Sequence, residues 1–163
     1  MRLSFSTLLL LALVAIGCQS RSQQAAEYND AIIASQVRIV EAFNSMDSVI
    51  NEFDEQEIDN SYYILRGRVK EGLKALDTLG VFQGDSTLYL ASKHLFLGYD
   101  TLVQTHYSEL IDLLLLPDSQ FTVEEQQKAF NAEARIAAHI NTLHAAYEER
   151  QLEFGEKFNV VFE

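Results

Sequence analysis

The sequence predicts an all-α fold, an antiparallel up-down-up-down four-helix bundle with long coiled-coil-like helices. Apolar residues recur at alternating spacings of four and three along four long segments, the pattern of a helix that buries one face. One proline and seven glycines leave few helix breakers in the 163 residues. The connections between the segments are short, as an antiparallel bundle requires.

The first helix is expected from about Gln24 to Phe53. Its seam runs through Ile32, Gln36, Ile39, Phe43, Met46, Ile50 and Phe53. Gln36 is the one polar member of that seam. A buried polar residue that sets the register, or a seam edge that faces water, is favoured over a ligand-binding role for Gln36.

The second helix is expected from about Glu57 to Leu79, with Gly80 as its left-handed cap. The acidic connection before it, residues 52–60, lacks the Asp-x-Asp-x-Asp-Gly order of a calcium-binding loop. We therefore interpret this connection as a solvated turn whose carboxylates favour the N-terminus of the second helix.

The second helix also carries much of the positive charge of the chain. Its basic residues are Arg66, Arg68, Lys70 and Lys74. Because the first helix carries Glu41, Asp47 and Glu52, we expect the cluster to form surface ion pairs with that helix, each of which contributes little stability.

The third helix is expected from about Thr87 to Leu115, after a cap by Asp85 or Ser86. A broad apolar stripe makes it the helix expected to be most buried. The central members of the stripe are Leu88, Ala91, Leu95, Tyr99, Leu102, His106, Leu110 and Leu113. Gly98 is expected to interrupt this helix without ending it.

The fourth helix has the clearest start in the chain. Pro117 ends the preceding helix, and Thr122 with Glu125 matches a capping box. The helix is expected from Val123 to about Phe158. Its predicted inward residues are Phe130, Ala134, Ala137, Ile140, His144, Tyr147, Phe154 and Phe158.

This topology places the loops near residues 55 and 119 at one end of the bundle and both termini with the 80–84 loop at the other. Apolar residues gather at the end with the termini. They are Val81, Phe82, Phe158, Val160, Val161 and Phe162. We expect them to pack as a cap under the bundle in preference to contacting lipid or a partner protein.

Length and charge narrow the function. Without residues 1–17 the chain has 146 residues, enough for one domain with a core. The full chain has 12 basic and 24 acidic residues, for a net charge of −12, which becomes −13 once Arg2 is removed with residues 1–17. Such a charge repels nucleic acid, and solubility explains it more simply than a specific cation site does.

The histidines do not match known metal or haem motifs. Di-iron bundles use Glu-x-x-His, whereas the residues three before the four histidines are Ala91, Val103, Ile136 and Asn141. Covalent haem needs two cysteines, and the chain has one. His94 and His144 are expected level on adjacent helices, and His106 level with Glu133, but histidines satisfied within the bundle are favoured over ligands. We predict no metal site and no cofactor.

Catalytic motifs are also missing from the sequence. It contains no Gly-x-Ser-x-Gly, no glycine-rich phosphate loop and no His-Glu-x-x-His. Tyrosines on apolar faces are expected in the core more readily than around a small-molecule pocket. These are Tyr62, Tyr63, Tyr99 and Tyr147. We therefore predict no catalytic residues and a protein that is not an enzyme.

The N-terminus is typical of a secretory signal. Met1-Arg2 precedes an apolar run that ends at Cys18, the only cysteine. A run of about nine apolar residues is too short to span a membrane, which takes roughly twenty.

Ala15-Ile16-Gly17-Cys18 resembles the lipobox of bacterial lipoproteins, although Ala15 stands where leucine is usual. The resemblance implies that Cys18 carries a diacylglyceryl group and that the chain is cut before it. Gln19, in place of aspartate, implies sorting to the outer membrane. The expected organisation is a signal peptide at 1–17, a short tether at 18–23 and a helical bundle at 24–163.

These observations predict a lipid-anchored protein of the bacterial cell envelope, held at the membrane through acyl chains on Cys18. We expect a non-enzymatic structural or interaction module with a protein partner and no nucleic acid. The alternative is a sensory bundle that binds a metal ion or a small apolar ligand between its helices.

Overall fold

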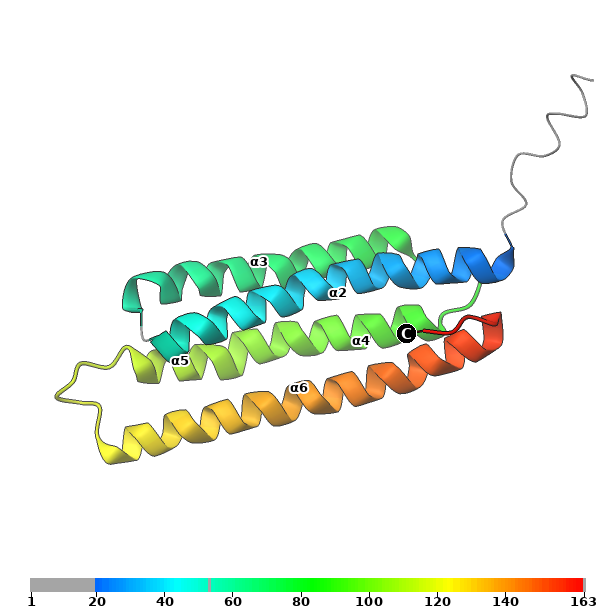
Figure 1. The fold of residues 1–163 in the computed structure, drawn as a ribbon. Coiled ribbons are helices and arrows are strands. Elements are labelled where there is room, and N and C mark those ends of the chain that lie inside the picture. The colour runs from blue at the N-terminus through cyan, green and yellow to red at the C-terminus, as the bar shows by residue number, and fades with distance from the viewer. Residues whose placement is uncertain (1–19, 53, 163) are drawn as a thin grey trace, which may run out of the picture.

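A computed structural model describes residues 20–52 and 54–162 of the chain. The described residues form helices and turns and no strand (Figure 1). The elements are α2 Arg21–Glu52, α3 Glu55–Leu79, α4 Thr87–Leu102, η1 Val103–Tyr107, α5 Ser108–Leu114 and α6 Val123–Phe158. Since α4, η1 and α5 follow one another without a break, they make one rod. The prediction of an all-α, four-helix fold is confirmed.

The four rods pack side by side, with α2 beside α3 and the α4–α5 rod beside α6 (Figure 1). Contact between α3 and α4 joins the two pairs. The seam between α2 and α6, the first and last helices, is less closed than the α2/α3, α3/α4 and α4/α6 seams. None of the described helices combines the length and apolar character that crossing a membrane requires.

Side chains and glycine define the helix ends. Asp54 caps α3 by accepting hydrogen bonds from the backbone N–H groups of Gln56 and Glu57. The predicted capping box is present in part. Thr122 Oγ1 accepts from the Glu125 N–H, as predicted, but the Glu125 carboxylate accepts from the Thr122 hydroxyl, because the Thr122 N–H donates to the Gln120 carbonyl. Gly80 follows α3 with a φ of +67°, which glycine adopts without strain.

Helix α2 begins at Arg21, earlier than the predicted start near Gln24. The helix therefore occupies part of the stretch expected to be a tether. Cys18, the signal segment and the lipobox lie outside the described residues, as does Phe53.

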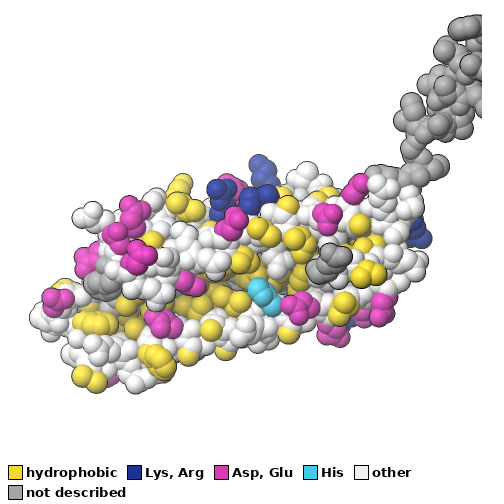
Figure 2. All heavy atoms as spheres, in the orientation of Figure 1, with side chains coloured by type: hydrophobic (Ala, Val, Ile, Leu, Met, Phe, Trp, Pro, Cys, Tyr) yellow, Lys and Arg dark blue, Asp and Glu magenta, His cyan; other side chains and the backbone are white. Residues whose placement is uncertain are grey.

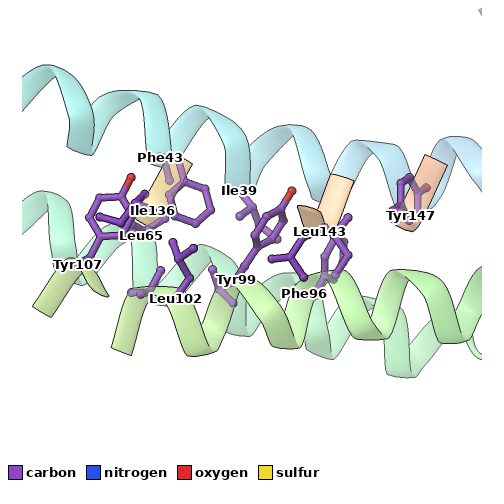
Figure 3. Close-up of a cluster of buried hydrophobic side chains, with 14 of the residues drawn as sticks. Ile39, Phe43, Leu65, Phe96, Tyr99, Leu102, Tyr107, Ile136, Leu143 and Tyr147 are labelled. Atoms are coloured by element: carbon purple, nitrogen blue, oxygen red, sulfur yellow. The ribbon is translucent and has the colours of Figure 1, made fainter. Parts of the chain in front are cut away.

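The core is centred on the α4–α5 rod, as the width of its apolar stripe predicts. Many of the largest fully buried side chains come from this rod: Leu88, Leu95, Phe96, Tyr99, Leu102 and Tyr107. Figure 3 shows Tyr99 and Tyr107 reaching from the rod toward Ile39 and Phe43 of α2. Phe43 meets both tyrosine rings, with centroid distances of 5.3 Å to Tyr99 and 5.6 Å to Tyr107.

Aromatic side chains close the end of the bundle where α2 begins and α6 ends, which we call the proximal end. The Phe82 ring lies 5.0 Å from Phe158, 5.6 Å from Phe154 and 5.2 Å from Tyr28, measured between centroids. The predicted cap is thus present around Phe82 and Phe158. Val81 and Val161 do not join it, because 50% and 90% of their surfaces are exposed.

The predicted inward face of α6 is wrong in the half of the helix near its N-terminus. Phe130, Ala134 and Ala137 are exposed. The buried residues there are Ala129, Ala132 and Ile136. A seam spaced at 3.5 residues drifts around a helix that turns every 3.6 residues, and alanines in both registers offer no large side chain to fix the face. Toward the other end of α6, Tyr147, Phe154 and Phe158 are buried as predicted.

Candidate functional site

A π-helical turn, η1, interrupts the third rod at Val103–Tyr107. Such turns widen a helix by one residue and occur frequently at functional sites. One backbone carbonyl of the turn, that of Val103, accepts a hydrogen bond from the Tyr62 hydroxyl of α3 at 3.2 Å. The turn also directs two neighbouring side chains toward different helices. His106 meets α6, while Tyr107 meets α2.

Tyr107 holds a carboxylate of α2. Its hydroxyl donates a hydrogen bond of 2.7 Å to Asp47 Oδ1. Burial raises the pKa of Tyr107 well above its usual range, so the phenol remains a donor. Although Asp47 as a residue is exposed, its carboxyl group lies against the bundle. This burial raises the pKa of Asp47, and the hydrogen bond from Tyr107 opposes the rise.

Asp47 stands on the wall of a groove between α2 and α6, which we call the α2/α6 groove. The groove encloses about 390 Å³. Its lining residues are Asp47, Ile50, Asn51, Leu110, Glu133, Ile136, Ala137, Ile140 and Asn141. Figure 2 shows apolar side chains at the bottom of the hollow between the α2 and α6 sides of the molecule.

The chemistry of the α2/α6 groove favours one type of ligand. Ile50, Leu110 and Ile136 form an apolar floor, whereas Asp47 and Glu133 supply carboxylates at the rim. No lysine or arginine belongs to the described lining. The groove therefore suits an apolar group that also carries a hydrogen-bond donor or a positive charge.

A polar layer crosses the middle of the bundle. The Tyr99 hydroxyl lies 2.5 Å from His144 Nε2, so α4 and α6 are joined by a hydrogen bond. Burial raises the pKa of Tyr99, and the neighbouring Gln36 amide works in the opposite direction. Gln36 is half-buried and its Oε1 has no hydrogen-bond partner. Gln36 therefore lies beside Tyr99 as the polar member of the α2 seam, with its Oε1 buried.

His144 is satisfied within the bundle, as the sequence favours, and neither of the contacts considered between His94 and His144 or between His106 and Glu133 is made. His144 bonds Tyr99, whereas His94 is exposed on the outer α4/α6 surface beside Ala146 and Arg150. His106 meets His139 instead of Glu133, with ring centroids 5.8 Å apart. Across residues 20–52 and 54–162, no group of three or more histidine, cysteine, aspartate or glutamate side chains is arranged to hold a metal ion.

The basic cluster of α3 does not pair with α2 as predicted. Arg68 binds Glu71 of its own helix at 2.8 Å, and the Arg66 guanidinium lies 5.6 Å from the Tyr62 ring centroid. No ion pair joins Lys70 or Lys74 to a described carboxylate. The reason is geometric, because all four basic residues are exposed and none lies on the buried face of α3.

Sequence reasoning missed the features that organise the α2/α6 groove. The π-turn has no proline or glycine to mark it. Tyr107 falls on the apolar stripe of its helix, but no pattern links it to Asp47 at 60 residues' separation. Only the level of the two helices in a bundle could suggest that contact.

Comparison of the chain with protein-family models, with curated proteins and with solved structures finds no match.

Proposed function

We propose that this protein is a lipid-anchored interaction module of the bacterial cell envelope, attached through acyl chains on Cys18. It has no catalytic role in the proposal, and it presents the sides of its bundle to a protein partner. The lipobox-like sequence supports the anchor. Sorting to the outer membrane belongs to the same proposal and depends on Gln19.

The observation that carries the proposal is where the helical body begins. Helix α2 starts at Arg21, three residues after Cys18, and the aromatic cap lies at the same end of the bundle. Three residues span at most about 10 Å. An acylated Cys18 would therefore hold the proximal end of the bundle at the bilayer and leave its sides accessible along their length.

Intact-mass measurement of the protein purified from bacterial membranes tests the anchor. The expected mass is that of residues 18–163 plus the acyl groups, and labelled fatty acid should be incorporated. Cys18→Ser should lose the label and release the protein from the membrane fraction. An unlabelled wild-type product, or a Cys18→Ser product that stays on the membrane, would contradict the proposal.

The α2/α6 groove favours a second candidate function, the binding of a small apolar ligand with a donor or cationic group. Its volume is within the usual range for ligand pockets, about 300 to 1,000 Å³. Titration with a fluorescent apolar amine tests this function. Binding should weaken on Ile136→Gln, which places a polar group in the floor, and should be unaffected by Val123→Gln on the exposed start of α6. Equal effects of the two substitutions would contradict it.

A further inference from the structure

The outward face of α3 differs from the rest of the molecule in charge. Between residues 61 and 76, four basic side chains stand against one carboxylate, Glu71, for a net charge of +3 in a strongly acidic protein. Figure 2 shows Lys and Arg side chains on the α3 side of the visible surface, with acidic side chains beside them and over much of the rest of that surface. We call this surface, Tyr63 to Lys74, the α3 face.

Most basic side chains of the α3 face make no ion pair with another described side chain of this protein. Within the part of the chain that the structure describes, only Arg68 among them has a carboxylate partner, Glu71. Arg66, Lys70 and Lys74 follow one another at intervals of four residues, and therefore form a row with steps of about 6 Å along the helix. The row is available to an incoming set of negative charges with the same repeat.

Apolar side chains accompany the row. Tyr63 is 77% exposed and Ile64 is 44% exposed, although both stand on a helix whose opposite face supplies the core. They border a shallow depression of about 420 Å³ that Arg66, Gly67 and Lys70 also line. The α3 face thus combines apolar contact with charge, as protein interfaces do.

Gly67 lies at the centre of the depression. A Cβ added there would meet no atom within 4 Å, so packing inside this protein does not require glycine. Glycine in a helix costs about 0.5 to 1 kcal/mol relative to alanine. Its effect here is to leave the helix backbone open between Tyr63 and Lys70, where a second helix can approach closely.

We propose that the α3 face binds an acidic amphipathic helix of a partner protein. Carboxylates spaced four residues apart on that helix pair with Arg66, Lys70 and Lys74, while its apolar residues meet Tyr63 and Ile64 across Gly67. The inference rests on the proposed function, because it specifies the chemistry of the protein partner that this function requires. Binding at the α3 face does not depend on whether Cys18 is acylated.

Other occupants fit the α3 face less well. A symmetric pairing of two copies would place one basic row against the other, which is repulsive. An anionic bilayer would attract the row but repel the acidic surfaces around it, and only two exposed apolar side chains would enter the interface. A helix is narrow enough to meet the row alone.

The test uses the protein purified as cells produce it, in a neutral detergent, and a labelled helical peptide of about 20 residues. The peptide carries glutamate at every fourth position beside an apolar stripe, and a matched peptide carries lysine instead. Fluorescence anisotropy should show binding of the glutamate peptide only. The affinity should fall as salt rises, because the attraction is screened.

Two variants locate the binding site. Lys70→Glu with Lys74→Glu should weaken binding at least about tenfold, whereas Lys128→Glu with Arg150→Glu makes the same change in net charge on α6 and should leave binding within about twofold. Gly67→Gln should also weaken binding about tenfold by filling the depression, without lowering the melting temperature.

Three results would overturn the proposal. The first is no binding of the glutamate peptide, or equal weakening by both pairs of charge reversals. The second is that the protein does not bind the peptide but binds phosphatidylglycerol vesicles, and that the Lys70/Lys74 variant loses the vesicle binding. The third is self-association in sedimentation, lost in that variant, again without peptide binding. None of these results bears on whether the intact mass shows acyl groups on Cys18. The proposed lipid anchor and the proposed helix-binding face can therefore fail independently.

Discussion

The two halves of α6 lie against the same bundle but pack against different sets of helices. Near the proximal end, Phe154 and Tyr28 meet with centroids 5.9 Å apart, and Gln151 donates a 2.7 Å hydrogen bond to Asn29, so α6 closes on α2. Near its N-terminus α6 packs on the rod, and the α2/α6 groove separates it from α2. Large aromatic residues close the half of α6 at the proximal end, whereas alanines leave the half near the N-terminus of α6 open.

Burial gives the proximal half its stability. The Tyr28 hydroxyl donates to the Gly80 carbonyl at 2.6 Å, and burial raises the pKa of Tyr28 to about 12. Contacts of this kind join α2, α6 and the loop that follows α3 at one place. The open half has space for a ligand because it lacks them.

The largest expected effect compares two phenylalanines of α6. Phe154→Ala should destabilise the protein by about 3 to 5 kcal/mol, because the side chain is fully buried and its loss leaves a cavity. Phe130→Ala should change stability by less than about 0.5 kcal/mol, since Phe130 is 65% exposed. Urea unfolding of both variants measures the difference, and similar losses would contradict the contrast.

Two glycines extend the comparison to the other helices. Gly98→Ala should destabilise by about 1 to 3 kcal/mol, because its Cβ would lie 2.5 Å from a methyl group of Leu143. Gly67→Ala should stabilise by about 0.5 to 1 kcal/mol, because its Cβ meets nothing. Thermal unfolding checks the opposite signs. A Gly98→Ala that stabilises the protein as Gly67→Ala does would show that α4 and α6 are not in close contact at Gly98.

Tyr107→Phe should destabilise the protein by about 1 to 2 kcal/mol. The substitution keeps the packing of the ring but removes the 2.7 Å hydrogen bond to Asp47, which leaves a partly buried carboxylate without that donor. Tyr63→Phe on the exposed α3 face is the matched control and should be neutral. A neutral Tyr107→Phe would mean that water replaces the phenol in the groove wall.

The smallest effect is a pH dependence at Asp47. Because the folded-state pKa of Asp47 is raised above its ordinary value, ionisation opposes folding, and this contribution reduces stability as pH rises through the interval between the two pKa values. Asp47→Asn should therefore gain stability over wild type above that interval, by less than about 1 kcal/mol, and lose the gain below pH about 3.8. Urea midpoints across pH test it, and a gain that persists in acid would contradict it.

The sequence was sufficient for the helices because strong caps and periodic apolar residues coincide. Thr122 and Glu125 define the start of α6, and the stripe of the third helix predicts the buried rod. The predicted buried face of α6 near Phe130 was wrong, because the alanines in that stretch fit either register. In that stretch tertiary contact, not local pattern, selects the buried side.

The candidate site was harder to predict than the helices. Asp47, Tyr107 and Glu133 come from three helices, and their proximity depends on a π-turn that no local residue signals. The basic residues of α3 were visible in the sequence, but their assignment to ion pairs with α2 failed because the helix directs them outward. Charge composition identifies such a cluster, whereas only the fold shows which way it faces.

Amide hydrogen exchange along α6 tests most directly the claim that one half of this helix is closed on the bundle and the other is open. We expect slower exchange for residues 143–158 than for residues 124–140, because only the former segment packs against α2 as well as the rod. Uniform protection along the helix, or faster exchange at the proximal end, would contradict it.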